Sequence, residues 1–215
     1  MTENVKKERE IASRREPSQD RARQRVDKIL ADTADLLMSS GLEKLTTNHI
    51  AKAAGMSVGS LYRYFPNKQS IIYELYKRWL AEVRDGLTVF RDSIEPGEEL
   101  ERLELRMFTA IYGDIDGKLH FSQLDVELGK AMQLYPELQE MDRLHGLKIA
   151  ELLRDIFKLA GAQGDDEQLL QLGSYLYAVN DSLHSAVEAG VPVAKALQWH
   201  RLAVRAVLEP YLTPK

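Results

Sequence analysis

A chain of 215 residues that is 44% hydrophobic is long enough to bury a substantial core in one large or two small domains. It contains no cysteine, which excludes disulfides, thiol catalysis and cysteine-ligated metal sites and fits a reducing cytoplasm. No apolar segment follows the charged N-terminus, and no run of about 18 apolar residues occurs, so we expect neither a secretory signal nor a membrane span.

The net charge of −4 conceals two differently charged parts. Through Arg84 there are 16 lysines and arginines against 11 acidic residues, whereas the remainder has 13 against 22. The negative total argues against nonspecific coating of nucleic acid, and the asymmetry predicts that the two parts have different tasks.

The first predicted helix begins near Ser18. Residues 1–19 mix basic and acidic side chains with almost no apolar ones, so they are interpreted as a flexible arm that cannot bury enough surface to order itself. Gly41 stands where a left-handed residue ends a helix. The apolar face of the helix consists of Val26, Ile29, Leu30, Ala34 and Leu37.

A second helix and a tight turn are predicted next. Thr46 or Thr47 can cap this helix, and Gly55 supplies the turn at its end. Its inward-facing residues are Ile50, Ala51 and Ala54.

Ser57 can cap a third, short helix that continues through Phe65 and is stopped by Pro66. Asn67 can cap a fourth helix. The apolar stripe of that fourth helix consists of Ile71, Ile72, Leu75, Trp79 and Val83.

Beyond Arg91 the apolar-periodic segments are longer. They are separated by turn residues at Pro96-Gly97, Asp116-Gly117, Tyr135-Pro136, Gly161–Asp166 and Gly190–Pro192. Since no alternating β-branched run competes, we predict an all-α chain of about nine helices. Its parts are a three-helix, helix-turn-helix unit at residues 20–67, a connecting helix at 68–91 and a larger antiparallel helical bundle at 92–215.

The stretch LTTNHIAKAAGMSVGSLYRYF has the features of a helix-turn-helix that enters the major groove of DNA. Ala51 and Ala54 permit close helix approach, and Gly55 permits the turn. Val58 and Leu61 are expected to point inward. The outward set is Gly59, Ser60, Tyr62, Arg63 and Tyr64.

The same stretch resembles the DNA-binding signature of the TetR family of bacterial transcription regulators, over roughly residues 22 to 70. The matching elements are Thr46-Thr47, Gly55-Met56-Ser57, Leu61–Phe65 and Lys68. The remainder resembles the family in architecture only. Many relatives carry a basic or polar residue in place of Val58 and an aromatic in place of Arg63, so the operator sequence is not inferred by analogy.

The resemblance implies a set of DNA contacts, in which Arg63 could pair with a guanine edge and the tyrosine hydroxyls suit phosphates. Lys68 and the first amides of the fourth helix together make an anion site. An alternative is that Tyr62 and Tyr64 are core aromatics. The implied contact residues are Thr47, Ser57, Gly59, Ser60, Tyr62, Arg63, Tyr64 and Lys68.

Arg21, Arg23 and Arg25 also have two interpretations. Their spacing lets Arg21 and Arg25 share a face toward the DNA backbone, but all three could equally be solvated charges.

The resemblance further implies a homodimer on a near-palindromic operator, joined through the last two helices. Their apolar stripes can build a four-helix interface, or they can fill the core of one chain. The stripe residues are Leu169, Leu172, Leu176, Val179, Leu183 and Val187, then Leu197, Leu202, Val204, Leu208 and Tyr211.

An effector pocket requires a few polar groups in an apolar lining. Asn180, His184 and Tyr175 are favoured because their spacing suggests that they lie near one another on one helix. All candidates could instead be ordinary core or surface residues. The candidate set is Tyr112, Phe121, Tyr175, Asn180 and His184.

Enzyme signatures are missing from the sequence. The five histidines lack metal-site spacing, and GDIDGK at 113–118 fits neither a phosphate loop nor a calcium loop, so it is interpreted as a polar turn. We therefore expect no metal, no cofactor and no catalysis. The predicted function is a DNA-binding repressor released by a small molecule, and the alternative is a constitutive or protein-regulated DNA-binding regulator.

Overall fold

A computed structural model of the protein describes residues 2–95, 98–115, 118–119 and 122–212. The chain forms two compact units, Met1–Leu75 and Tyr76–Lys215, so the division falls inside one helix. Each unit is helical, as the sequence predicts, and each is described by itself below.

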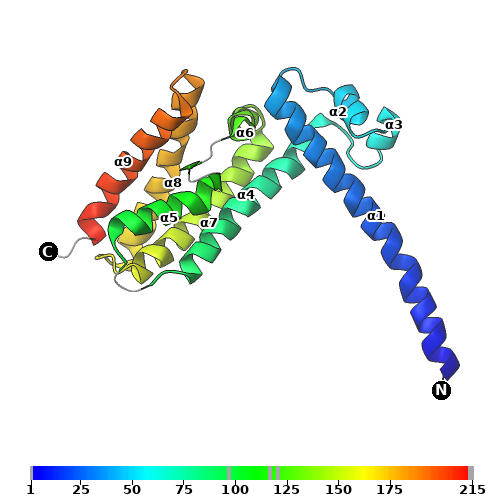
Figure 1. Cartoon of the computed structure of the whole chain (residues 1–215), viewed down its shortest axis with the longest axis horizontal. Helices are drawn as coiled ribbons and strands as arrows, with labels where there is room; N and C mark the ends of the chain where they lie inside the picture. Colours follow the sequence, from blue (N-terminus) through cyan, green and yellow to red (C-terminus); the bar gives the residue numbers. More distant parts are fainter. Residues whose placement is uncertain (1, 96–97, 116–117, 120–121, 213–215) are drawn as a thin grey trace. The chain divides into compact units, whose positions relative to one another are not determined.

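The N-terminal unit contains α1 (Thr2–Ser40), α2 (Thr47–Ala53), α3 (Val58–Leu61) and the start of α4 (Lys68–Asp92) (Figure 1). The helix α1 ends as predicted, because Gly41 adopts a φ of 78° and its amide donates to the Leu37 carbonyl at 3.0 Å.

The start of α1 differs from the expectation of a flexible arm over residues 1–19, because the helix begins at Thr2. The first 19 residues have no periodic apolar residues, so the hydrophobic pattern could not predict a helix there. Glutamate, lysine and arginine make up nine of these 19 residues, and they have high intrinsic helix propensity. Local propensity accounts for the longer helix.

The helices α2 and α3 are joined closely because small and apolar residues meet where they pack. Ile50 and Leu61 are fully buried, and Ala51 and Ala54 are 1% exposed. The predicted inward face of the second helix is confirmed. Val58 is only half-buried, so the expectation that it points inward holds in part.

The C-terminal unit contains the rest of α4 and five further helices. These are α5 (Leu100–Tyr112), α6 (Gln123–Leu134), α7 (Pro136–Leu159), α8 (Asp166–Glu188) and α9 (Val193–Leu212). In the described residues the helix number matches the predicted nine. Figure 1 shows α8 and α9 side by side as an antiparallel pair, and the two helices pack against each other.

Two short strands interrupt the helical pattern in the segment predicted to be a polar turn. β1 (Asp114–Ile115) pairs antiparallel with β2 (Lys118–Leu119). The Asp116-Gly117 pair between them lies outside the described residues, as does Pro96-Gly97.

The closest helix contact of this unit, α7 against α8, depends on glycine. A β-carbon at Gly173 would lie 2.7 Å from the Ala150 carbonyl oxygen, and one at Gly146 would lie 2.6 Å from the Tyr177 ring. Capping boxes at Ser122 and Asp165 fix the starts of α6 and α8.

The apolar stripes assigned to dimerisation are mostly core. Seven of their leucines and valines are at most 7% exposed and belong to the hydrophobic clusters of this unit. For these residues the alternative interpretation is correct, because the bundle must cover its most apolar helix faces itself. Leu202, by contrast, is 58% exposed.

Within the described parts of the chain, no helix combines the length and apolarity that crossing a bilayer requires.

Candidate DNA-binding surface and ligand cavity

The turn between α2 and α3 is fixed by local hydrogen bonds. The Thr46 side chain accepts from the His49 amide at 3.2 Å, and the Ser57 hydroxyl accepts from the Ser60 amide at 3.1 Å. Gly55 between them has a φ of 66°, which favours glycine. Both predicted caps and the turn residue are confirmed.

The helix α3 ends at Leu61, earlier than predicted, but its last turns continue as backbone hydrogen bonds. The amides of Tyr64 and Phe65 both donate to the Leu61 carbonyl, at 2.9 and 3.0 Å. The helical order of side chains is therefore kept through Phe65, which is buried as predicted.

One polar surface gathers the predicted contact residues of α2 and α3. Ser57, Gly59, Tyr62 and Arg63 are exposed, whereas Thr47, Ser60 and Tyr64 are half-buried. Tyr62 is 49% exposed, which excludes the core interpretation for this ring.

Hydrogen bonds link the side chains of this surface to one another. Arg63 Nη2 donates to Ser60 Oγ at 3.3 Å, and Ser57 Oγ donates to the same atom at 2.9 Å. Thr47 Oγ1 and the Tyr62 hydroxyl lie 3.4 Å apart. Thr47 of α2 is therefore a direct neighbour of the side chains that follow α3.

Lys68 begins α4 and is half-buried. The start of that helix is capped as predicted, because Asn67 Oδ1 accepts from the Ser70 amide at 2.8 Å. On α1, Arg21, Arg23 and Arg25 are all exposed, which agrees with both interpretations given for them.

The C-terminal unit holds a cavity of about 630 Å³ between α4, α5, α6, α7 and α8. This volume is within the usual range of small-molecule sites. Four aromatic side chains and four carboxylates line it. They are Tyr76, Trp79, Tyr112 and Tyr177, and Glu82, Asp125, Asp142 and Asp181.

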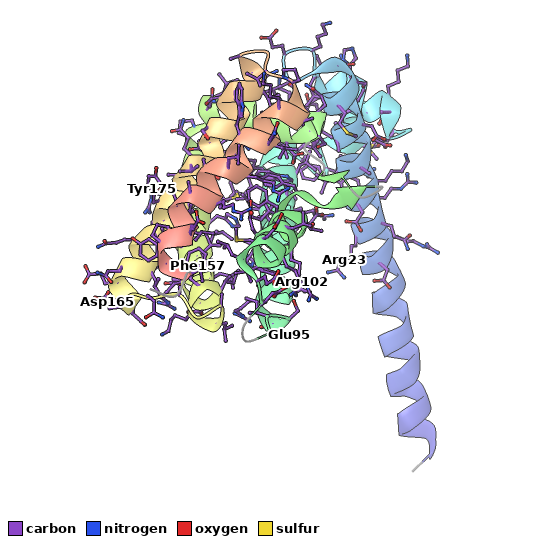
Figure 2. All side chains as sticks on the ribbon, turned by 60° about the vertical axis from the view of Figure 1, so that its left-hand side comes forward. Arg23, Glu95, Arg102, Phe157, Asp165 and Tyr175 are labelled. Atoms are coloured by element: carbon purple, nitrogen blue, oxygen red, sulfur yellow. The ribbon has the colours of Figure 1, made fainter. Side chains whose placement is uncertain are left out.

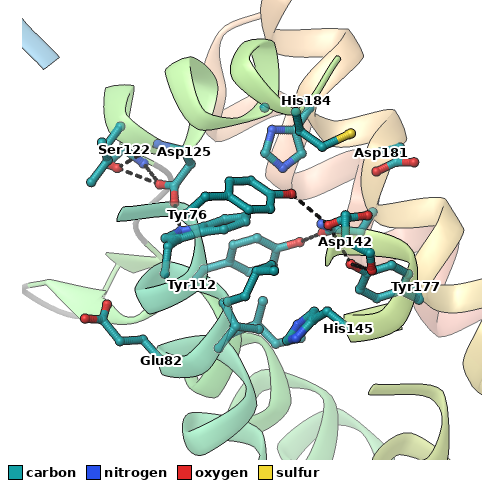
Figure 3. Close-up of a pocket in the computed structure, with 18 of the residues that line it drawn as sticks. Tyr76, Glu82, Tyr112, Ser122, Asp125, Asp142, His145, Tyr177, Asp181 and His184 are labelled. Atoms are coloured by element: carbon teal, nitrogen blue, oxygen red, sulfur yellow. Dashed lines mark hydrogen bonds between the residues drawn. The ribbon is translucent and has the colours of Figure 1, made fainter. Parts of the chain in front are cut away.

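Asp142 is the centre of one hydrogen-bond network in the cavity. The hydroxyls of Tyr76 and Tyr177 both donate to Asp142 Oδ1 at 2.8 Å (Figure 3). Burial, and then the charge of Asp142, raises the pKa of both tyrosines above their usual range. The two hydroxyls therefore stay protonated donors.

Asp125 is the centre of a second network. Its Oδ1 accepts from the Trp79 indole nitrogen at 2.7 Å, and its Oδ2 accepts from the Ser122 hydroxyl at 2.6 Å. Because Asp125 also belongs to the capping box of α6, the start of α6 holds the indole of α4 in place.

Further polar lining residues come from α5 and α8. The Tyr112 hydroxyl donates to Asn180 Oδ1, joining α5 to α8. His184 faces α6 where Gly129 leaves room, because a β-carbon there would lie 2.9 Å from His184 Nδ1. Burial lowers the pKa of His184 below its ordinary value.

Three of the predicted effector residues, Tyr112, Asn180 and His184, line this cavity. Tyr175 does not. It is 56% exposed, and Figure 2 shows it at the outer edge of the bundle. At about 100° per residue it lies about 140° from Asn180 and about 180° from His184 around α8, so the proximity argument from spacing was wrong. Phe121 lies outside the described residues.

The sequence missed the residues that α4 and α7 bring to the cavity. Trp79 was assigned only to an apolar stripe, and Tyr76, Asp142 and Tyr177 were not singled out as a group. An aromatic pair three residues apart, at Tyr76 and Trp79, was the one available signal. Among the described residues, no group of histidines and carboxylates is arranged to hold a metal ion.

The fold and these sites define a helix-turn-helix protein with an attached helical domain that contains a cavity. Residues 29–75 match the family model described as bacterial regulatory proteins, tetR family. This match confirms the resemblance stated from the sequence for the N-terminal unit, which carries a DNA-binding region of the tetR type.

The chain is also similar to proteins named nucleoid occlusion factor SlmA. The nucleoid occlusion factor SlmA of Haemophilus ducreyi is 40% identical over 57 residues, which cover 26% of this chain and only 28% of that protein. SlmA of Edwardsiella ictaluri is 28% identical over 173 residues, which cover 76% of this chain and 82% of that protein.

A solved structure supports the fold over most of the chain. A TetR-family transcriptional regulator from Marinobacter aquaeolei VT8 superposes with a TM-score of 0.65 and 22% identity, covering 88% of this chain and 91% of that one. Identity at this level bears on the fold alone.

Proposed function

We propose that the protein is a cytoplasmic, homodimeric repressor that binds a near-palindromic operator and is released by a small molecule bound in the C-terminal cavity. The observation that carries the DNA-binding part is the exposed polar surface of α3, held by a capped turn and backed by the buried Leu61 and Phe65. A short helix of this kind suits the major groove.

The proposed contacts follow from side-chain chemistry and exposure. Arg63 reads a base edge, since its guanidinium can pair with guanine in a bidentate way. Ser57 and Ser60 lie beside it, and Gly59 lets the backbone approach. Phosphate contacts are assigned to Thr47, Tyr62, Tyr64 and Lys68.

The dimer is proposed to form on the outer faces of α8 and α9 rather than through the buried stripes. Tyr175, Trp199 and Leu202 are large apolar side chains that are at least half-exposed on these two helices. In sedimentation experiments Leu202→Glu should yield monomers. Leu159→Glu, at a similarly exposed position of α7, is the control and should leave the dimer intact.

The helix α4 is proposed to couple the two sites. It begins at Lys68, and further along it contributes Tyr76, Trp79 and Val83 to the cavity. A ligand that favours one position of α4 would change the spacing of the two recognition helices in a dimer. Coupling of about 1–3 kcal/mol would weaken DNA binding about 5–150-fold.

Selection of bound sites from random DNA tests the first part. We expect one near-palindromic sequence to be enriched, and a pool without any preferred sequence would contradict the proposal. A thermal-shift screen then tests the second part. An effector should raise the melting temperature and also weaken binding to the selected operator. If no ligand does both, the alternative of a constitutive or protein-regulated regulator gains support.

A second candidate function rests on the relative from Edwardsiella ictaluri, which matches over 76% of this chain and carries the name nucleoid occlusion factor. A chromosome-wide map of binding sites separates the candidates. A few sites at promoters favour a repressor, whereas many dispersed sites together with misplaced division over the nucleoid in a deletion strain favour occlusion.

A further inference from the structure

Acidic side chains outnumber basic ones in the described cavity lining. The described lining includes Glu82, Asp125, Asp142 and Asp181 and no lysine or arginine. The hydrogen-bond donors to Asp125 and Asp142 are an indole, hydroxyls and an amide, all of them neutral. The basic groups of the described lining are the imidazoles of His145 and His184, and burial lowers the pKa of both. The four carboxylates therefore give this lining an excess of negative charge.

Two of these carboxylates lie close enough to repel each other. Burial, and then the charge of Asp142, raises the pKa of Asp181. In Figure 3 both lie at the same side of the cavity, with Asp125 and Ser122 at the other. A positive ligand group beside the pair would relieve this repulsion, whereas an anion would add to it.

The aromatic lining favours the same charge. The rings of Tyr76 and Trp79 lie 5.5 Å apart between centroids, and their polar atoms are already engaged with Asp142 and Asp125. Trp79 is half-buried, so part of its indole remains as a contact surface, whereas Tyr76 is only 1% exposed and supports the indole from behind the lining. Aromatic ring faces carry negative charge density and attract cations.

A bare metal ion does not satisfy these features. No described histidines and carboxylates are grouped as metal ligands, and the volume of about 630 Å³ exceeds what one ion needs. The occupant must combine a positive charge with a body large enough to cover aromatic rings.

We propose that the cavity takes an organic cation with a bulky apolar or aromatic body, its charge beside Asp142 and Asp181 and its body against the indole of Trp79. This inference rests on the proposed function, because it names the chemical class of the effector for the same site.

Probes of one shape and different charge test the proposal on the full chain. Tetraphenylphosphonium is the cation, tetraphenylborate is the anion of nearly the same shape, and triphenylphosphine oxide is a neutral analogue. By equilibrium dialysis we expect the cation to bind at least tenfold more tightly than the neutral compound and the anion not to bind. Equal or tighter binding of the anion would overturn the inference.

Substitutions of the two neighbouring carboxylates test whether the cation binds in this cavity. Asp181→Asn and Asp142→Asn should each weaken cation binding severalfold, and the pair should weaken it at least tenfold, while the melting temperature without ligand stays close to that of the parent chain. Asp155→Asn, on α7 outside the cavity lining, is the matched control. If the double variant is folded and binds the cation as the parent does, the cavity is not the site.

Fluorescence adds a readout that general destabilisation would not mimic. The chain has two tryptophans, so Trp199→Phe leaves Trp79 as the single indole. The cation should then change Trp79 emission with the same affinity as in dialysis, and an unchanged emission would contradict binding against this ring.

The two proposals fail in different ways. If the cation binds the cavity but leaves DNA affinity unchanged, the ligand class stands and the effector role fails. If a neutral or anionic compound binds the cavity and releases DNA while the cation does not bind, the effector role stands and the inference about charge is overturned.

Discussion

The helix-turn-helix surface and the cavity are both built from aromatic and polar side chains, yet they are assembled in different ways. The surface comes from one continuous stretch between Thr46 and Lys68, whose caps and turn are set by neighbouring residues. The cavity needs side chains from five helices, from Tyr76 to Ser185. A site of the first kind depends on local conformation, and a site of the second kind depends on how helices pack.

The largest expected effect is a loss of stability that is confined to the N-terminal unit. Leu61→Ala removes a fully buried side chain from the N-terminal unit and should cost about 2–5 kcal/mol. Hydrogen exchange should show α2 and α3 losing protection while α7 and α8 keep theirs. Equal loss in both units would show that they unfold together. Leu159→Ala, at a position that is 52% exposed, is the control and should change little.

Alanine substitutions at two glycines should affect the cavity and the DNA-binding surface separately. In Gly146→Ala the new β-carbon would lie 2.6 Å from the Tyr177 ring, which must move and weaken its bond to Asp142. We expect about 1–3 kcal/mol of destabilisation and weaker ligand binding, with DNA affinity retained. Gly59→Ala meets nothing within 4 Å, so it should not destabilise the fold but should weaken DNA binding. Calorimetry and DNA titration measure the two effects, and the reverse pattern would contradict both assignments.

Arg63 and Lys68 test whether the surface divides base recognition from phosphate binding. Arg63→Ala should cost about 1–3 kcal/mol on the selected operator and relax preference at one base pair. Lys68→Ala should weaken all sequences similarly and reduce the salt dependence by about one phosphate contact. DNA titrations over a range of salt concentrations measure both. Equal loss on specific and random DNA for Arg63→Ala would make Arg63 a phosphate contact.

Acid should affect the bundle through its buried histidines. Burial lowers the pKa of His145 and His200 to about 4, against an ordinary value of 6.5. The unfolded chain therefore takes up protons first as the pH falls. The contribution of these two histidines to the free energy of unfolding is fully present above about pH 6.5. It is lost as the pH falls from about 6.5 to 4, by at most about 1.4 kcal/mol per pH unit for each imidazole.

Chemical denaturation at several pH values measures this slope. A chain carrying His145→Phe and His200→Phe should show a flatter pH dependence in that window. His49→Gln, at an exposed position of α2, should leave it unchanged. An unaltered slope in the double variant would assign the acid sensitivity to other groups.

The sequence was sufficient for the helix-turn-helix because its signals are local. The caps at Thr46, Ser57 and Asn67 and the turn at Gly55 each involve residues a few positions apart. The same reasoning failed for Tyr175, where closeness in sequence was taken for a shared helix face. It also favoured a partner interface for the apolar stripes of α8 and α9, seven of whose residues the bundle buries in its own core.

The sequence by itself therefore determined the class of fold, the division into a basic and an acidic part, and the caps and turn of the helix-turn-helix. Tertiary structure alone decided which side chains share the cavity, and that four carboxylates and four aromatic rings lie in its described lining without a lysine or arginine. The physical reason is that helix periodicity tells which faces of a helix are buried, whereas the partner of each buried face depends on packing between segments far apart in the chain.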